Sequence, residues 1–253
     1  MPRANRYHIP HQIWHITHRC HRGEFLFKFA RDRERWLHWL FEARKRYGLC
    51  ILNYIVTSNH IHLLAVDGDS DEVSRSIQLI AGRVGQEYNQ RKQRKGAFWE
   101  DRYHATAIES GEHLLRCLVY IDMNMVRAGA VAHPADWKQS GYHEIQYPPN
   151  RYRLIDRQRL IELCGFSGDE QLSRMHQQWV EEAIVEHQLQ RKPEWTEAVA
   201  VGSREFALQI KGSLAGRAGS RQIIDAGEGF ELREPEISYN ANFDDEMGPL
   251  STQ

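Results

Sequence analysis

The segment LCILNYIVTSNHIHLLAV, residues 49–66, contains two apolar stretches, 49–56 and 60–66, that are typical of buried strands. Thr57-Ser58-Asn59 between them has the composition of a tight turn, so the segment predicts an antiparallel hairpin at the centre of a sheet. His60 and His62 are two residues apart on the second strand and therefore point to the same face. Two imidazoles on one face can bind a single divalent cation.

This His-x-His pair is weak support for a metal site when taken alone. A chain with 14 histidines contains about one such pair by chance. A pair of surface or packed histidines therefore stays open as the alternative at this point.

The flanking sequence predicts further elements from apolar residues at strand or helical spacing. In chain order these are a strand at 12–18, a helix at 31–47, the hairpin, a helix at 72–92, a strand at 103–108 and a helix from Ser110 to about 127. Gly48 is expected to end the first helix, and the acidic stretch 67–72 to cap the second. This order favours an α+β fold, an antiparallel sheet with helices packed on one face.

The chain divides at the linker 145–155, which contains Pro148-Pro149. We expect a first domain at 1–147, a mainly helical extension at 148–224, with helices over 156–189 and 196–216, and an acidic, poorly ordered tail at 225–253.

Charge is distributed unevenly although the net charge is -1. Residues 1–150 carry 21 Lys and Arg against 16 Asp and Glu, whereas residues 151–253 carry 12 against 18. The basic part is where a polyanion would bind, with drift in composition as the alternative. None of the four cysteines forms a CxxC pair, the N-terminus lacks the apolar core of a signal peptide, and no apolar run reaches membrane-span length. We therefore expect reduced thiols in a cytoplasmic protein.

A second pattern is YIDMNMVRAG, residues 120–129. On a helix, Tyr120 and Asn124 are four residues apart and share a face. A tyrosine on an amphipathic helix is most often a core or rim residue, so this pattern also has a structural alternative.

Three segments in order are more specific: TSNHIHLLAV (57–66), GAFWEDRYHATAI (96–108) and YIDMNMVRAGAV (120–131). Over roughly residues 7–145 the chain resembles the IS200-like transposases of small insertion sequences, and most closely the REP-associated tyrosine transposases. Those proteins carry an N-H-x-H-L-L strand, a W-x-x-R-(F/Y) segment and a Y-I-x-x-N-P-V-x-A-G helix. Met125 stands where that family usually has proline, which puts in doubt the backbone just after Asn124.

The resemblance implies a ferredoxin-like HUH domain at 1–147 and a DNA-cleaving enzyme. It makes His60, His62 and Asn124 the ligands of Mg²⁺ or Mn²⁺, and Tyr120 the nucleophile. The implied substrate is single-stranded DNA that carries a hairpin, which the enzyme would cleave and rejoin through a 5′-phosphotyrosine without a nucleotide cofactor.

DNA contacts are expected from the basic residues near these motifs, with a solvated surface as the alternative. The candidates for phosphate contact are Arg91, Lys92, Arg94, Lys95, Arg102 and Arg127, and those for base stacking are Trp99 and Tyr103. The N-terminal histidines His8, His11, His15, His18 and His21 are expected to have surface or core roles, since His15 and His18 fall on opposite strand faces.

Other functions stay open. The chain can be a domesticated nuclease that cleaves hairpin repeats, or a catalytically silent protein that binds single-stranded DNA. A metal-dependent hydrolase would need further ligands, for which Asp67 and Asp69 are the nearest carboxylates. The expected partner is DNA, and no association with a membrane is expected. A monomer and a homodimer are both compatible with the resemblance.

Overall fold

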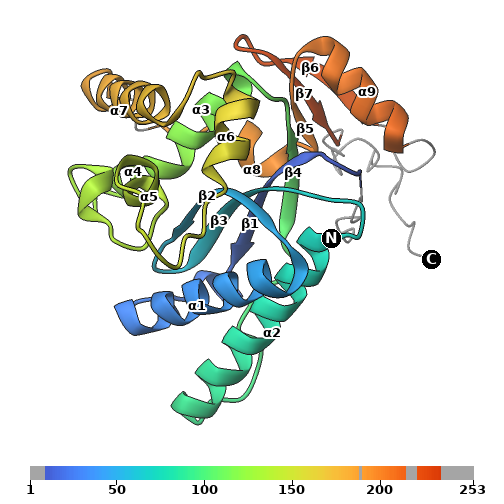
Figure 1. The fold of residues 1–253 in the computed structure, drawn as a ribbon. Coiled ribbons are helices and arrows are strands. Elements are labelled where there is room, and N and C mark those ends of the chain that lie inside the picture. The colour runs from blue at the N-terminus through green and yellow to red at the C-terminus, as the bar shows by residue number, and fades with distance from the viewer. Residues whose placement is uncertain (1–8, 188–189, 215–220, 235–253) are drawn as a thin grey trace, which may run out of the picture.

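The computed structural model describes residues 9–187, 190–214 and 221–234. Within these residues one seven-stranded sheet has the order β2-β3-β1-β4-β5-β7-β6 (Figure 1). Neighbouring strands are antiparallel except β4 and β5, which are parallel. The strands are β1 (Ile13–Arg19), β2 (Cys50–Val56), β3 (His60–Val66), β4 (His104–Ile108), β5 (Ala200–Gly202), β6 (Gln222–Asp225) and β7 (Phe230–Arg233). None of the helices in the described ranges is both long and apolar enough to cross a membrane.

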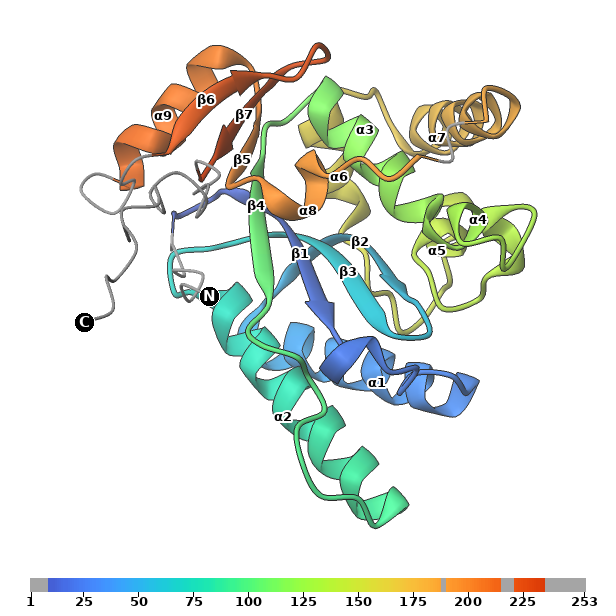
Figure 2. The same cartoon turned by 180° about the vertical axis from the view of Figure 1, so that it is seen from behind.

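Helices cover both faces of this sheet (Figures 1 and 2). They are α1 (Ala30–Tyr47), α2 (Glu72–Lys92), α3 (Glu112–Asp122), α4 (Asn124–Arg127), α5 (Tyr142–Gln146), α6 (Arg157–Cys164), α7 (Asp169–Val185), α8 (Glu194–Glu197) and α9 (Arg204–Leu214). On one face His15 of β1 hydrogen-bonds Trp195 of α8. On the other, His18 lies against Trp99, whose indole N–H donates to Ala81 of α2. The predicted α+β class is confirmed, but the helices are not restricted to one face.

The expected helix ends are only partly as predicted. Gly48 has φ of 72° and ends α1, the left-handed conformation that glycine adopts at least cost. Asp67 accepts a hydrogen bond from the backbone N–H of Val73, so the acidic stretch does satisfy the first turn of α2. Ser110 does not open the next helix, which begins at Glu112 and ends at Asp122. The helix expected to reach residue 127 is therefore two helices, α3 and α4, separated at Met123.

The C-terminal extension is helical in α6, α7, α8 and α9, but it also supplies β5, β6 and β7 to the same sheet. Its apolar side chains, such as Leu160, Trp195 and Leu232, belong to the same buried cluster as Ile16 of β1. The buried cluster therefore contains side chains from both sides of the expected boundary at residue 147. Residues 225–234, expected in a poorly ordered tail, include β7, while 235–253 lie outside the described residues. Strands of three or four residues are too short to show a clear period in sequence.

A buried polar pair joins the extension to α3. Asp122 accepts hydrogen bonds from Asn53 of β2 at 3.1 Å and from His176 of α7 at 2.7 Å. The side chains of Asp122 and His176 are both essentially inaccessible to solvent. Because an unpartnered buried carboxylate is costly, this pair holds the end of α3 in place.

We expect His176→Ala to lower the free energy of unfolding by about 3–5 kcal/mol, because it leaves the Asp122 carboxylate buried without its imidazole partner. Urea denaturation measures this as a lower midpoint at unchanged slope. Gln177→Ala, an exposed change on the same helix, should alter the free energy by less than about 0.5 kcal/mol. If His176→Ala lowers the free energy of unfolding by less than about 1 kcal/mol, the Asp122–His176 pair does not stabilise the fold as described.

Candidate functional site

The three predicted metal ligands lie close together on one face of the sheet. β3 begins at His60, and the ring centres of His60 and His62 are 5.0 Å apart. Asn124 begins α4, and its side-chain Nδ2 lies 2.9 Å from Nε2 of His62. The amide donates this hydrogen bond, so Nε2 of His62 carries a lone pair.

Both histidines are neutral in this structure. Burial lowers the pKa of His60 to about 4, and the positive charges of Arg19 and Arg127 act in the same direction. Burial lowers the pKa of His62 well below its usual value, as do the neighbouring His60 and His15. Nδ1 of His60 lies 2.7 Å from the Asn59 side-chain oxygen and donates to it, which leaves Nε2 of His60 unprotonated.

His15 lies directly behind His62. Nδ1 of His62 is 2.9 Å from Nε2 of His15, and Nδ1 of His15 is 2.8 Å from the main-chain oxygen of Trp195. Burial lowers the pKa of His15 to about 3. The sequence predicted a surface or core role for His15 and did not predict this contact with His62. Thr17 pairs with His62 in the sheet, which puts His15 on the same face, but that register is a tertiary feature that the sequence alone does not specify.

Tyr120 projects from α3 beside these histidines and is 7% exposed. Its ring centre is 6.0 Å from that of His62 and 6.1 Å from that of Trp195. The guanidinium carbon of Arg127 lies 4.1 Å from the Tyr120 ring centre. Burial raises the pKa of the Tyr120 phenol, whereas the positive charge of Arg127 lowers it. The structure thus brings Tyr120, Asn124 and Arg127 together beside the histidine pair.

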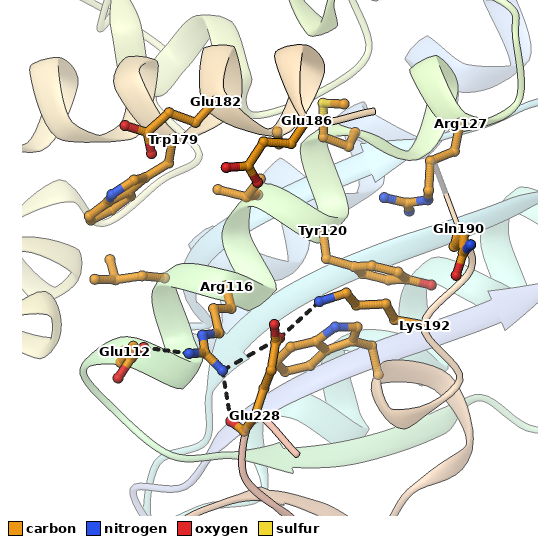
Figure 3. Close-up of a pocket in the computed structure, with 15 residues that line it drawn as sticks. Glu112, Arg116, Tyr120, Arg127, Trp179, Glu182, Glu186, Gln190, Lys192 and Glu228 are labelled. Carbon is orange, nitrogen blue, oxygen red and sulfur yellow. Dashed lines mark hydrogen bonds and ion pairs between the residues drawn. The ribbon is translucent and has the colours of Figure 1, made fainter. Parts of the chain in front are cut away.

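A cavity of about 290 Å³ opens beside Tyr120, between α3, α7 and the segment before α8. Figure 3 shows the Tyr120 ring extending from α3 toward the side where Arg127 and Gln190 lie. On the opposite side Arg116 pairs with Glu112 and Glu228, and Lys192 pairs with Glu228 at 2.9 Å. These ion pairs join α3 to the C-terminal extension along the wall of the cavity.

Two buried donors in the lining of this cavity have no hydrogen-bond partner within the described part of the chain: Nη2 of Arg127 and Nε1 of Trp195. Buried N–H groups are usually paired, so an unpaired one needs a reason. An anionic ligand in the cavity would supply acceptors for both.

The basic run lies at the far end of α2, away from α3 (Figures 1 and 2). Arg91 pairs with Asp32, and Arg94 with Glu24 at 3.3 Å. Lys92 lies 5.4 Å from the ring centre of Phe29. Lys95 and Arg102 are exposed. Of the predicted phosphate contacts, only Arg127 lines the cavity beside Tyr120.

The predicted stacking residues are held by internal contacts. The Trp99 ring centre is 3.9 Å from that of His18, and the Trp99 indole N–H donates to the oxygen of Ala81. Tyr103 is buried and its hydroxyl bonds Ser74. These contacts favour packing roles for Trp99 and Tyr103.

The donor set around His62 fits a divalent cation, since two neutral imidazoles and an amide leave coordination positions open. Across the ranges 9–187, 190–214 and 221–234, no three or more His, Cys, Asp or Glu residues form a ligand cluster. Asp67 caps α2, and Asp69 pairs with His11 at 3.2 Å, both beyond the end of β3 opposite His60. The carboxylates that a hydrolase would need are therefore not placed near His60 and His62.

Comparisons with known proteins give one family match. Residues 9–124 match the family model described as "Transposase IS200 like", a segment that contains His60, His62, Tyr120 and Asn124. No curated protein matches the chain.

Two solved structures are similar. The structure of a REP-associated tyrosine transposase bound to a REP hairpin has 20% sequence identity and a TM-score of 0.50, covering 61% of this chain and 90% of that chain. A putative transposase from Deinococcus radiodurans has 12% identity and a TM-score of 0.32, covering 44% of this chain and 88% of that chain. The first likeness shows a shared fold.

Proposed function

We propose, because residues 9–124 match the IS200-like transposase family, that the chain cleaves and rejoins single-stranded, hairpin-bearing DNA with Tyr120 as the nucleophile. The observation that carries the proposal is the convergence of Tyr120 and Arg127 with the His60, His62 and Asn124 ligand set. A nucleophile, a cation and a set of metal ligands within one site are what transfer of a phosphoryl group requires.

The covalent step is a substitution at phosphorus. The phenol oxygen of Tyr120 loses its proton and bonds the scissile phosphorus, while the bond from phosphorus to the 3′-oxygen breaks. The departing 3′-oxygen gains a proton, so the products are a 5′-phosphotyrosine and a free 3′-OH with no net proton change. The phosphotyrosine keeps the diester bond energy, and attack by another 3′-OH reverses the step and rejoins DNA.

The surrounding residues bind and orient the phosphate. His60, His62 and Asn124 would hold Mg²⁺ or Mn²⁺, which when bound polarises the scissile phosphate and offsets its developing charge. Arg127 and the indole N–H of Trp195 donate to phosphate oxygens and so satisfy their unpaired N–H groups. The buried setting of Tyr120 limits water, which protects the phosphotyrosine from hydrolysis.

The hairpin itself would lie along basic surface outside this cavity. We propose phosphate contacts from Lys92, Lys95 and Arg102, which are exposed, with Arg91 and Arg94 exchanging their carboxylate partners for phosphate. The Trp99 side chain would pack beneath this basic surface. We place the activity in the cytoplasm, with either a monomer or a homodimer of this chain as the active form.

The test uses a labelled hairpin oligonucleotide from the DNA that flanks the gene, with Mg²⁺, with Mn²⁺ and with a chelator. We expect a covalent protein–DNA adduct on a denaturing gel only when metal is present, and mass spectrometry of the digested adduct to place the nucleotide on Tyr120. Hairpin binding without any adduct would instead support the catalytically silent DNA-binding protein.

The rate of adduct formation should rise with pH, because burial raises the pKa of Tyr120 and the reactive phenolate is then scarce at neutral pH. Below the pKa its fraction grows about tenfold per pH unit. The pKa of His60 is about 4 and that of His62 is well below its usual value, so neither should add a second proton dependence.

Single-turnover rates between about pH 6 and pH 8 measure this as a slope of about 1 in a plot of log rate against pH. A slope of about 2 near pH 6.5 would mean that the histidines titrate like exposed ones. A flat profile would mean that proton loss from Tyr120 does not limit the step.

A further inference from the structure

His15 joins the C-terminal extension to the metal ligands through a chain of hydrogen bonds. The main-chain oxygen of Trp195 can only accept, so Nδ1 of His15 donates to it at 2.8 Å. A neutral His15 then has only a lone pair on Nε2, which lies 2.9 Å from Nδ1 of His62. His62 must therefore donate from Nδ1, and its Nε2 is left unprotonated.

The hydrogen bond at the other end of this series, between Asn124 and His62, is consistent with that assignment. Nε2 of His62 lies 2.9 Å from the side-chain nitrogen of Asn124, which donates to it. The same nitrogen is the atom of His62 that would bind a metal. A metal-bound histidine is commonly oriented through its second ring nitrogen, which fixes both the tautomer and the ring plane.

The carbonyl that anchors His15 is itself held firmly. Thr106 of β4 donates to the oxygens of Trp195 at 3.3 Å and of Ala198 at 2.8 Å. His104 of β4 contacts the Ala198 oxygen at 3.0 Å. These bonds fasten α8 across β4, and Trp195 is 3% exposed. Trp195 lies 71 residues beyond the end of the family match at residue 124.

We propose that His15 is a positioning residue which, anchored by the Trp195 carbonyl, holds His62 in its Nδ1–H tautomer and so makes the C-terminal extension part of the active site. The proposal rests on the proposed function only in taking His62 as a metal ligand. Without His15, Nδ1 of His62 loses its acceptor and the proton can move to Nε2, where it blocks the lone pair.

The first experiment reads the tautomer in the metal-free, DNA-free protein. Long-range ¹H–¹⁵N spectra of the imidazole rings distinguish a protonated Nδ1 from a protonated Nε2, and the His62 signals are assigned by their loss in His62→Gln. We expect His62 protonated at Nδ1 in the parent protein. Protonation at Nε2 would overturn the proposal, and this measurement requires no change at His15.

The second experiment measures Mn²⁺ affinity by calorimetry in the absence of DNA. His15→Phe keeps a ring but removes both nitrogens, and we expect it to weaken Mn²⁺ binding about 10- to 100-fold. His15→Gln keeps an acceptor for His62 and should restore binding to within about threefold of the parent.

His18→Phe is the matched control, since His18 is a buried histidine of the same strand that bonds the Asp101 main-chain oxygen on the opposite face of the sheet from His62. We expect its Mn²⁺ affinity to stay within about threefold of the parent. Equal Mn²⁺ affinity in His15→Phe and the parent would overturn the proposal, as would equal weakening in His15→Phe and His18→Phe. Neither experiment uses DNA. Failure of the protein to form a DNA adduct would therefore contradict the proposed function without contradicting the positioning role of His15.

Discussion

We expect Tyr120→Phe to abolish the covalent adduct and to leave binding of the hairpin DNA and of Mn²⁺ within about threefold of the parent protein. The variant lacks only the phenol oxygen, which is the atom that would bond phosphorus. Removal of a nucleophile costs at least about 10⁴-fold in rate, so no adduct should be visible on a denaturing gel. The ring remains and keeps its contacts with Arg127, His62 and Trp195.

Tyr142→Phe is the matched control, since Tyr142 is also buried but belongs to a separate apolar cluster with Met123 and Val180. It should form the adduct at the parent rate to within about threefold. An adduct that persists in Tyr120→Phe would identify another nucleophile and end the assignment of Tyr120. Weak DNA binding in Tyr120→Phe would mean that the hydroxyl holds substrate rather than attacks it.

The first half of the fold was predictable because its elements are long and regular. The strand at 60–66 coincides with β3, and the helix at 72–92 coincides with α2. Alternation along β3 correctly put His60 and His62 on one face, since period two is a local property of a strand. The break at Met123 was not predictable from spacing, and it did not separate Asn124 from His62, because α4 begins at Asn124 itself.

The contacts of His15 and Trp195 at the site depend on tertiary pairing, which the sequence alone does not predict. His15 meets His62 only through the register of β1 with β3, and Trp195 acts through a carbonyl that every residue type possesses. The residue type at position 195 therefore does not predict such a contact. The sequence therefore predicted a separate, mainly helical extension, although the carbonyl and the indole of Trp195 both lie at the candidate site.

Arg127→Ala should slow adduct formation about 10²- to 10³-fold, comparable to the removal of one charge-stabilising donor from an active site. Arg127 lies against the Tyr120 ring, and one of its N–H groups has no partner within the described residues. Its charge favours the phenolate and, in the proposed mechanism, its free N–H binds the phosphate. Single-turnover rates with the hairpin substrate measure the loss.

Arg127→Lys keeps the charge without the planar fork of donors and should lose only about tenfold. Arg116→Ala is the matched control, because Arg116 lines the same cavity but is already paired with Glu112 and Glu228. It should stay within about threefold of the parent rate. A rate for Arg127→Ala that equals that of Arg116→Ala would remove Arg127 from the mechanism.

Mn²⁺ binding separates a chemical role of Arg127 from damage to the site. The positive charge of Arg127 lowers the pKa values of both His60 and His62, which means that it also disfavours a second cation near them. Arg127→Ala should therefore bind Mn²⁺ as tightly as the parent or more tightly, while it cleaves DNA far more slowly. Loss of Mn²⁺ affinity together with the rate would instead show that Arg127 supports the ligand geometry, and the assignment of its free N–H to the phosphate would fail.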